Sequence, residues 1–398
     1  MRPKVLDDSQ MRLLRNPSDD ESLDNYSVKQ RWAEFRQNLP HQNLPYSKRN
    51  WGSPAHSICS YQGKLKPALA HHLVRAFSNP GDVVVDPFSG AGTIPFEACQ
   101  LGRIGIGIDI SRLGYVLSRA KCRPPEIGAI ESIIVELDHF IRDNEPTPDD
   151  YQSAHSVSFN SAIPEYFHAD TLREILLSRR FFLGRWGESD AWAYAFACCA
   201  HLLHGNRPYA LSRNSHPITP FKPTGEAEYR ALVPRLRDKA ARTAKEWPTS
   251  FVAGRAIHGD CIQPWSVESA DAIITSPPFF DSTRFYMTNW MRYWFMGWER
   301  SDFKNAVTDF LETKQRKSIM VYADFFEQAA SALRPGGYAI LHLGMSKKCD
   351  MAAELAALLP ETLDLVDIAY EAVGHCESHG VRDKGTVSSH SYLVLQRT

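Results

Sequence analysis

One stretch restricts the fold of this chain more than any other: a short apolar strand that runs through a glycine-rich turn into a helix. The strand is VVVDPF (83–88), the turn is SGAGT, and the helix is IPFEACQLG (94–102). A second apolar strand, RIGIGIDIS (103–111), follows at once. This order and spacing indicate a right-handed crossover between parallel strands, and strands this short and apolar suit a sheet buried on both faces. The sequence therefore predicts an α/β protein with a mostly parallel, twisted sheet.

The strand pattern stops after Ser111 and resumes only near Arg255. Apolar residues at helical spacing fill the interval, which we interpret as a largely helical insertion. Two last strands (364–373 and 388–397) follow each other without a helix between them, so one antiparallel strand is expected near the C-terminus. The predicted units are an N-terminal arm (1–50), the first half of the α/β domain (51–125), the helical insertion, a possible recognition region (126–252), and the second half of the α/β domain (253–398).

The composition excludes several classes of protein. The chain has 398 residues, 43% hydrophobic and 23% charged, with a formal net charge of -1, which is typical of a soluble globular protein. No apolar stretch is long enough to cross a bilayer, and the N-terminal stretch lacks the apolar core of a secretory signal. We therefore expect a cytoplasmic protein without a membrane partner.

The cysteines do not indicate a metal site. The eight cysteines form no C-x-x-C pair, which argues against a disulfide framework or a structural zinc site. His375, Cys376 and His379 lie close together in VGHCESHG, but a four-ligand zinc site needs another donor at recognisable spacing. The sequence thus predicts no bound metal.

Acidic residues stand at the ends of three predicted strands: Asp86, Asp109 and Asp260. The carboxyl ends of parallel strands share one sheet edge, where doubly wound folds bind ligands. At the second strand, Asp109 suits the two hydroxyls of a ribose, and Asp260 suits an adenine amino group. A solvated strand-end aspartate is the alternative for each residue. Their joint occurrence favours a cofactor that contains a nucleoside.

The glycine turn adds to this candidate site. Gly90 and Gly92 let a ligand approach the backbone, and the amides at the start of the following helix favour a carboxylate. The spacing is not G-x-G-x-x-G and no P-loop lysine follows, which disfavours a nucleoside triphosphate. A tight turn that needs glycine for its geometry alone is the alternative.

The segment Ser276-Pro277-Pro278-Phe279 follows the strand ADAIIT. Consecutive prolines hold the backbone extended and leave carbonyl oxygens unpaired. An exocyclic base amine is a poor nucleophile because its lone pair is conjugated with the ring. Accepting its hydrogens at Ser276 Oγ and the Pro277 carbonyl would localise that lone pair for in-line attack on a sulfonium methyl group. Phe279 would stack on a base flipped out of a duplex; a proline-stiffened loop is the alternative.

These motifs resemble those of a known family. DPFSGAGT, GIDIS and TSPPF look like the cofactor and catalytic motifs of the amino-group DNA methyltransferases, which form N4-methylcytosine or N6-methyladenine. SYQGKLKPALAHHLVRAFSNPGDVVVDPFSGAGT resembles the family's stretch before its cofactor loop. The resemblance covers roughly residues 60–120 and 256–398. It implies a Rossmann-like class I methyltransferase fold with S-adenosyl-L-methionine as the cofactor.

The resemblance also implies roles for the matched residues. Serine before the two prolines is more typical of the enzymes that act on N4 of cytosine. The implied catalytic residues are Ser276, Pro277, Pro278 and Phe279. The implied cofactor-binding residues are Lys64 or Lys66, Asp86, Phe88, Gly90, Gly92, Thr93, Asp109 and Asp260.

We therefore predict methylation of N4 of cytosine in double-stranded DNA, by direct transfer to a flipped base, with a cognate restriction endonuclease as a candidate partner. N6 of adenine in DNA, a base amine in RNA, and a catalytically silent nucleic-acid-binding protein are the alternatives. No Pro-Cys dipeptide occurs, so the covalent route to ring-carbon methylation has no evident nucleophile.

Two segments are candidates for holding DNA. Between Arg207 and Lys245 basic residues outnumber acidic ones, which favours phosphate contacts, with a solvated helix face as the alternative. The aromatic residues of FDSTRFYMTNWMRYWFMGWER (280–300) either wall a base pocket or belong to the core, and the helical spacing of the tryptophans favours the core. Arg284, next to the proline segment, is the predicted DNA contact there.

Overall fold

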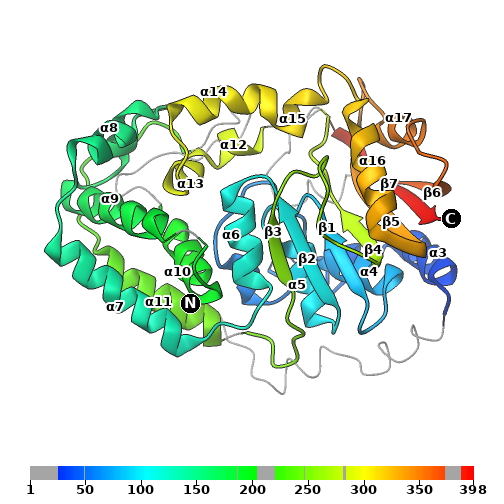
Figure 1. Cartoon of the computed structure of the whole chain (residues 1–398), viewed down its shortest axis with the longest axis horizontal. Coiled ribbons are helices and arrows are strands. Elements are labelled where there is room, and N and C mark those ends of the chain that lie inside the picture. The colour runs from blue at the N-terminus through cyan, green and yellow to red at the C-terminus, as the bar shows by residue number, and fades with distance from the viewer. Residues whose placement is uncertain are drawn as a thin grey trace.

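A single sheet organises the part of the chain that the structure describes. The computed structural model describes residues 26–398 except 49, 186, 204–219, 246, 281–283 and 373–386. In these residues, seven strands form one sheet with the order β3-β2-β1-β4-β5-β7-β6 (Figure 1). The strands are β1 (Val83–Asp86), β2 (Ile104–Asp109), β3 (Arg255–His258), β4 (Ala270–Thr275), β5 (Leu333–Ser346), β6 (Leu363–Ala372) and β7 (Val387–Arg397).

The strand directions confirm the predicted fold class. β1 pairs in parallel with β2 and β4, and β2–β3 and β4–β5 are also parallel. β7 lies between β5 and β6 and is antiparallel to both. A parallel sheet that ends in one inserted antiparallel strand is the class I methyltransferase fold that the motifs imply.

Helices cover both faces of the sheet. α4 and α5 pack with the N-terminal helix α3 on one face, and α16 and α17 pack on the other. The helices that flank the sheet are α3 (Val28–Asn38), α4 (Pro67–Phe77), α5 (Thr93–Gln100), α6 (Arg112–Lys121), α16 (Val321–Ala332) and α17 (Met351–Ala356). Short 3₁₀ turns are η1 (Pro40–Gln42), η2 (Pro54–Ser57) and η3 (Ile163–Tyr166).

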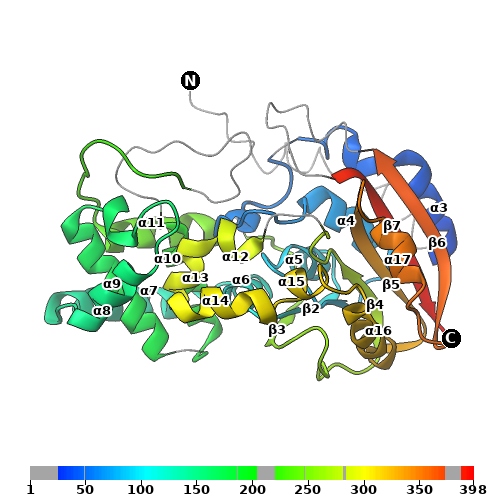
Figure 2. The same ribbon diagram turned by 90° about the horizontal axis from the view of Figure 1, so that it is seen from above.

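The interval between β2 and β3 is helical, as its periodicity predicts. Beyond α6, its helices gather at one end of the molecule, opposite β6 and β7 (Figures 1 and 2). They are α7 (Ile127–Asp143), α8 (Pro148–Ser156), α9 (Ala169–Gly184), α10 (Asp190–His201) and α11 (Leu232–Lys245). A second helical group, α12 (Phe285–Thr288), α13 (Trp290–Phe295), α14 (Arg300–Asp309) and α15 (Leu311–Lys314), follows the proline segment.

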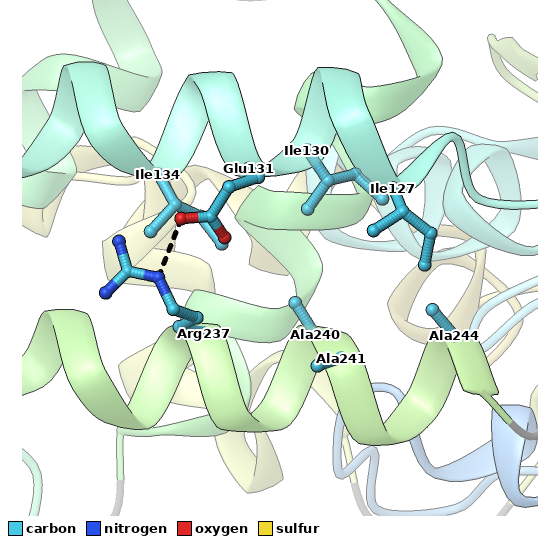
Figure 3. Close-up of a pocket in the computed structure, with 8 residues that line it drawn as sticks. All are labelled: Ile127, Ile130, Glu131, Ile134, Arg237, Ala240, Ala241 and Ala244. Atoms are coloured by element: carbon cyan, nitrogen blue, oxygen red, sulfur yellow. Dashed lines mark hydrogen bonds and ion pairs between the residues drawn. The ribbon is translucent and has the colours of Figure 1, made fainter.

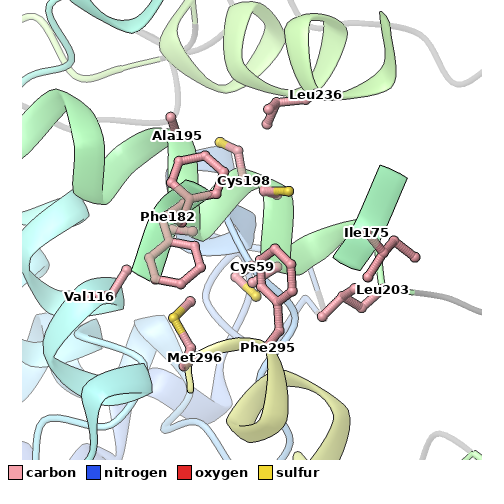
Figure 4. Packing of buried hydrophobic residues seen from close by; sticks show 14 of the residues in the cluster. Cys59, Val116, Ile175, Phe182, Ala195, Cys198, Leu203, Leu236, Phe295 and Met296 are labelled. Atoms are coloured by element: carbon pink, nitrogen blue, oxygen red, sulfur yellow. The ribbon is translucent and has the colours of Figure 1, made fainter. Parts of the chain in front are cut away.

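The helical insertion shares its core with the sheet domain. Val116 of α6, Phe182 of α9, Cys198 of α10 and Phe295 of α13 belong to one buried cluster (Figure 4). Burial of large apolar side chains contributes roughly 1.5–3 kcal/mol each. Apolar packing therefore joins the insertion to α6 and α13.

α7 and α11 lie side by side within the insertion. Isoleucines of α7 face alanines of α11, and Glu131 pairs with Arg237 at 2.7 Å (Figure 3). The cavity between them has a volume of about 30 Å³. A volume of that size holds about one water molecule, so this gap is a packing defect and not a ligand site.

The segment predicted to be an arm contains helix α3 in its second half. A capping box between Ser27 and Gln30 begins the helix. Trp32 is buried and its Nε1 donates to Asp367 of β6 at 2.7 Å, while Phe35 stacks on Trp32. Tertiary contacts thus order a stretch whose polar composition gave little helical signal.

Candidate active site

The glycine turn and the proline segment meet at one edge of the sheet. β1 and β4 are parallel neighbours, so the turn after Asp86 and the turn after Thr275 leave the sheet on the same side. Thr275 Oγ1 donates a hydrogen bond of 2.6 Å to Asp86 Oδ1, although 189 residues separate the two. This bond ties the start of the candidate cofactor site to the start of the candidate catalytic segment.

The glycine turn folds back onto two aspartates. The backbone N–H of Phe88 donates to Asp86 Oδ1 at 3.1 Å, and that of Gly90 donates to Asp109 Oδ2 at 2.8 Å. Gly90 and Gly92 have positive φ angles of 47° and 68°, which L-residues with a Cβ rarely adopt. A Cβ on Gly92 would lie 2.8 Å from the Ser118 Cα, so packing against α6 also requires glycine there.

Asp109 holds the turn closed from the end of β2. Its Oδ1 accepts from the Ser111 N–H at 2.8 Å and the Ser111 hydroxyl at 2.6 Å, while its Oδ2 accepts from Gly90. Burial raises the pKa of Asp109, and the bonds from Ser111 and Gly90 oppose that rise. Each carboxylate oxygen has further lone pairs, so this geometry leaves acceptor capacity for a ligand.

Asp86 and Asp260 extend the acidic row to both sides of Asp109. Burial raises the pKa of Asp86 to about 7, because desolvation outweighs its hydrogen bonds from Thr275 and Phe88. Asp260 follows β3, beside β2, and its Oδ1 accepts from the Ile262 N–H at 3.3 Å. Since β3, β2 and β1 are consecutive in the sheet, the structure brings the three predicted aspartates to one edge.

Three further predicted residues lie around the glycine turn. Phe88 packs its ring against Phe325 of α16, with centroids 5.4 Å apart. Thr93 is the first residue of α5; its Oγ1 is buried and has no hydrogen-bond partner among the described residues. Lys64 is half-buried and its Nζ donates to the His56 carbonyl at 3.2 Å, whereas Lys66 is exposed and precedes α4.

A buried lysine that the sequence analysis did not single out, Lys121, donates a hydrogen bond to the backbone of the glycine turn. Lys121, the last residue of α6, is 1% exposed, and its Nζ donates to the Ala91 carbonyl at 2.5 Å. Burial, followed by the nearby Lys64 charge, lowers the pKa of Lys121 to about 7. A lysine at the end of an amphipathic helix is ordinarily solvated, so no sequence signal separated it from a surface cation.

The proline segment is held by a buried glutamine. Gln315, just after α15, is 1% exposed, and its Nε2 donates to the Pro278 carbonyl at 3.0 Å and reaches the Phe279 carbonyl at 3.4 Å. Tyr322 donates in turn to Gln315 Oε1 at 3.0 Å. Among the described residues nothing donates to the Pro277 carbonyl. Gln315 thus engages the carbonyls of Pro278 and Phe279 and leaves that of Pro277, which is the carbonyl predicted to accept a hydrogen from the base amine.

Ser276 and Phe279 both contact β5. Ser276 Oγ lies 3.1 Å from His342 Nδ1. The Phe279 ring packs against His342 and His390, with centroids 5.5 and 5.7 Å away. Half-buried Phe279 thus presents only part of its ring to the sheet edge, and the sequence did not single out His342.

Replacing Gly344 with alanine tests the position of the Phe279 ring. A Cβ on Gly344 would lie 2.6 Å from Phe279 Cδ2, so the ring has to move. We expect kcat to fall about tenfold because the ring is misplaced, and the melting temperature to fall as well because the added methyl group is forced into a packed site. The matched control is Gly128→Ala on α7, where a Cβ meets nothing within 4 Å. An unchanged kcat in the Gly344 variant would show that the ring position does not matter.

The aromatic segment after the proline segment is mostly core, as its spacing favours. Trp290 and Trp294 of α13 are 0% and 1% exposed. Trp298 lies beyond the helix, after Gly297, and stacks on Phe310. Buried Asn289 clasps the backbone of Gln62: its Oδ1 accepts from the Gln62 N–H at 3.0 Å and its Nδ2 reaches the Gln62 carbonyl at 3.3 Å. This contact joins the segment before α4 to the second helical group.

The basic residues of α11 divide into two sets. Arg237 pairs with Glu131, and Lys239 is buried with its Nζ donating to the Ser57 carbonyl at 2.6 Å. Arg235, Arg242 and Lys245 are exposed. Arg284, half-buried, donates from Nη1 to the Tyr286 hydroxyl at 3.1 Å. The predicted basic residues Arg207 and Arg213 lie outside the described residues.

The sequence also led us to expect neither a bound metal nor a membrane-spanning segment, and two observations on the described residues bear on these expectations. Within the described ranges, no three His, Cys, Asp or Glu side chains gather as a metal site would need; the segment with His375, Cys376 and His379 lies outside them. No helix of the described part is both long enough and apolar enough to cross a membrane.

The chain is similar to DNA methyltransferases over part of its length. The model of the N6/N4 family, described as DNA methylase, matches residues 7–115. Type II methyltransferase M.MjaII of Methanocaldococcus jannaschii is 32% identical over 82 residues, 21% of this chain and 16% of that protein. Type II methyltransferase M.HpaI of Haemophilus parainfluenzae is 41% identical over 66 residues, 17% of this chain and 21% of that protein.

The name of a third relative states which DNA base that relative methylates. The DNA adenine methyltransferase YhdJ of Escherichia coli is 35% identical over 85 residues, 20% of this chain and 29% of that protein. The matched segments span less than a third of the length of each of these relatives. Among solved structures, TrmN from Thermus thermophilus aligns over 87% of this chain and 53% of its own, with 14% identity and a TM-score of 0.38.

Proposed function

We propose that this chain, a member of the amino-group DNA methyltransferase family, methylates N4 of cytosine in DNA. The observation that carries the proposal is the hydrogen bond between Thr275 and Asp86. This bond supports the proposal because it joins the end of β1, before the glycine turn, to the end of β4, before the Ser-Pro-Pro-Phe segment, and a methyl donor at the first and a base amine at the second would face each other.

The cofactor is S-adenosyl-L-methionine, the methyl donor of this family, and the residues present fit it. Buried Asp86, whose pKa is raised to about 7, gains from a nearby positive charge such as an ammonium group. The buried, unpartnered Thr93 Oγ1 offers a polar atom beside the glycine turn. We assign the ribose hydroxyls to Asp109 and the adenine amino group to Asp260. The methionine end is assigned to Lys64, Asp86, Phe88, Gly90, Gly92 and Thr93.

The Ser-Pro-Pro-Phe segment (276–279), which we call the clamp, is proposed to act on the target amine. When bound, the cofactor supplies a methyl group on a positively charged sulfur. Ser276 Oγ and the Pro277 carbonyl accept the two hydrogens of the amine, which directs its lone pair toward that methyl group. As the N–C bond forms, the C–S bond would break and its electron pair would stay on sulfur. The methylated amine would then lose one of its two hydrogens as a proton to water. The partly exposed face of Phe279 stacks on the base. A base in a duplex must flip out to reach this rim, and the stacking offsets part of the energy of leaving the helix.

The preference for cytosine over adenine rests on Ser276. Serine in this position is more typical of the N4-cytosine enzymes, whereas the relative YhdJ is named an adenine enzyme. N6 of adenine in DNA is therefore the second candidate, because the same two acceptors fit either amine. A base amine in RNA is the third candidate.

A nucleoside analysis distinguishes these candidates. The purified chain is incubated with methyl-labelled cofactor and plasmid DNA, and the DNA is digested to nucleosides. We expect label in N4-methylcytosine; label in N6-methyladenine alone would transfer the proposal to adenine. Label only in RNA offered in parallel would contradict the DNA assignment, and label in neither polymer would contradict the proposed function.

We further propose that the insertion (126–252) forms the recognition region and that exposed Arg235, Arg242 and Lys245 of α11 contact DNA phosphates. Each lost phosphate contact lowers the slope of log K against log salt by about 0.9. Replacing all three with glutamine is therefore expected to reduce that slope by up to about 2.7, as measured by DNA binding at a series of salt concentrations. Arg237→Gln is the matched control because Arg237 already pairs with Glu131. An unchanged slope in the triple variant would place the DNA elsewhere, for example at Arg284.

The cellular setting follows from the family. Because protective methyltransferases of this kind accompany restriction enzymes, we propose a cognate endonuclease as a partner and the cytoplasm as the location. We also propose the division into an arm (1–50), two halves of the catalytic domain (51–125 and 253–398) and the insertion. Sequencing of methylated DNA from cells that express the chain would report both the base and the recognition sequence.

A further inference from the structure

Buried His342 lies against both functional side chains of the clamp. It stands on β5, the strand next to β4, and is 3% exposed. Its Nδ1 is 3.1 Å from Ser276 Oγ, and its ring packs on Phe279. A single imidazole thus contacts the proposed hydrogen acceptor and the proposed stacking ring.

The direction of the hydrogen bond between Ser276 and His342 decides what the serine can do. A hydroxyl is one donor and two acceptor lone pairs. If Nδ1 carried the hydrogen, His342 would use one serine lone pair and the serine hydrogen would be free to point at the substrate. If Nδ1 is the acceptor, the serine hydrogen points to β5 and both lone pairs face the rim. Only the second arrangement fixes the serine hydrogen away from the amine, so that a serine lone pair, and not the hydroxyl hydrogen, faces the one amine hydrogen that Ser276 accepts.

The surroundings keep the imidazole neutral. Burial, and then the neighbouring His390 of β7, lower the pKa of His342 well below its usual value. Glu371 of β6 and His41 of η1 are the other charged or titratable groups that act on it. Glu371 is already engaged by His41, at 2.9 Å, and by Gln42 and Tyr392. A neutral ring has one bare nitrogen to offer as an acceptor. His342 Nε2 is buried and has no partner among the described residues, so the contact with Ser276 is the one hydrogen bond that the ring makes there, and the tautomer sets its direction.

We propose that His342 is the positioning residue of the clamp: its Nδ1 accepts the Ser276 hydroxyl hydrogen, which turns that hydrogen away from the target amine and leaves a serine lone pair for one of the amine hydrogens. This inference rests on the proposed function, since it explains how a serine does the work of a pure hydrogen-bond acceptor. His342 does not touch the substrate and acts through Ser276.

Double-variant kinetics test whether His342 acts through Ser276. His342→Phe keeps a ring but has no acceptor, and His342→Asn keeps an acceptor close to the Nδ1 position. We expect His342→Phe to lower kcat about 10- to 100-fold with an unchanged Kd for the cofactor, and His342→Asn to recover most of that loss. In a Ser276→Ala background, His342→Phe should lower kcat less than about threefold, because the serine hydroxyl through which His342 acts on the amine is absent. An equal loss in both backgrounds would show a structural role only and would overturn the proposal.

A spectroscopic measurement tests the proposal without relying on turnover. The full chain is labelled with ¹⁵N in its histidines, and the His342 signals are assigned by their absence in His342→Asn. We expect Nδ1 to have the shift of a bare, hydrogen-bonded nitrogen, Nε2 to carry the hydrogen, and Ser276→Ala to shift Nδ1. A hydrogen on Nδ1 would overturn the proposal. Lack of methyl transfer to any nucleic acid would instead contradict the proposed function, so the two failures are distinguishable.

Discussion

Under the proposed function, replacing Ser276 with alanine is expected to lower kcat for methyl transfer about 10²- to 10³-fold and to leave the Kd for the cofactor nearly unchanged. The expected size is that of removing one preorganised hydrogen-bond partner from a reacting group. The Kd is expected to stay unchanged because Ser276 follows β4, whereas the assigned cofactor residues other than Lys64 lie at or after the carboxyl ends of β1, β2 and β3. Single-turnover methylation and cofactor titration by calorimetry measure the two quantities separately.

The control for this variant is Ser132→Ala on α7, whose hydroxyl donates to the Gly128 carbonyl far from the sheet edge. It should leave both kcat and Kd unchanged. If Ser276→Ala kept full turnover, the hydroxyl would not accept an amine hydrogen, and the clamp mechanism would be wrong. A large change in the cofactor Kd instead would mean that Ser276 belongs to the cofactor site.

Replacing Asp109 with asparagine is expected to raise the Kd for the cofactor about 100-fold. An amide loses the charge that strengthens hydrogen bonds from ribose hydroxyls, each worth roughly 1.5–3 kcal/mol. Its NH₂ group also cannot accept from the Gly90 N–H, which now donates to Asp109 Oδ2 at 2.8 Å, so the glycine turn loosens as well. At saturating cofactor, kcat should recover to within a few-fold of the unchanged chain.

The control here is Asp364→Asn, an exposed aspartate on β6 at the other end of the sheet. It should bind the cofactor as the unchanged chain does, as measured by the same calorimetric titration. Cofactor affinity that is unaffected in Asp109→Asn would remove the ribose assignment. A loss of kcat at saturating cofactor would place Asp109 in the catalytic step.

Local patterns were enough to predict the sheet strands near the site. The strand, glycine turn and helix around Asp86 follow from apolar runs and from residues with restricted or permissive backbones, which act within a few positions. The edge shared by Asp86, Asp109 and Asp260 was predictable too, because parallel strands place their carboxyl ends together. Helix α3 was not predicted, since Trp32 and Phe35 provide only a narrow apolar stripe and their partners lie on β6, β7 and α4.

The residues that brace the site were invisible for a different reason. Lys121, Gln315, Asn289 and His342 are polar residues whose partners are distant in the sequence; Ser276 and His342, for example, are 66 residues apart. The flanking amino-acid sequence does not distinguish such a residue from one whose side chain is exposed to water. Its role depends on which carbonyl or hydroxyl comes within about 3 Å, and only packing of the whole chain sets that distance.

The sequence by itself determined the fold class and the sheet edge where the acidic residues gather, and it predicts the chemistry of the Ser-Pro-Pro-Phe segment. These depend on backbone geometry and hydrophobic periodicity, which are local properties. Only the tertiary structure decided that Thr275 bonds to Asp86, that Arg237 and Lys239 of α11 have partners within the protein, and that an imidazole lies next to Ser276. Those facts depend on contacts between segments far apart in the chain, and such contacts exist only once the apolar cores have packed.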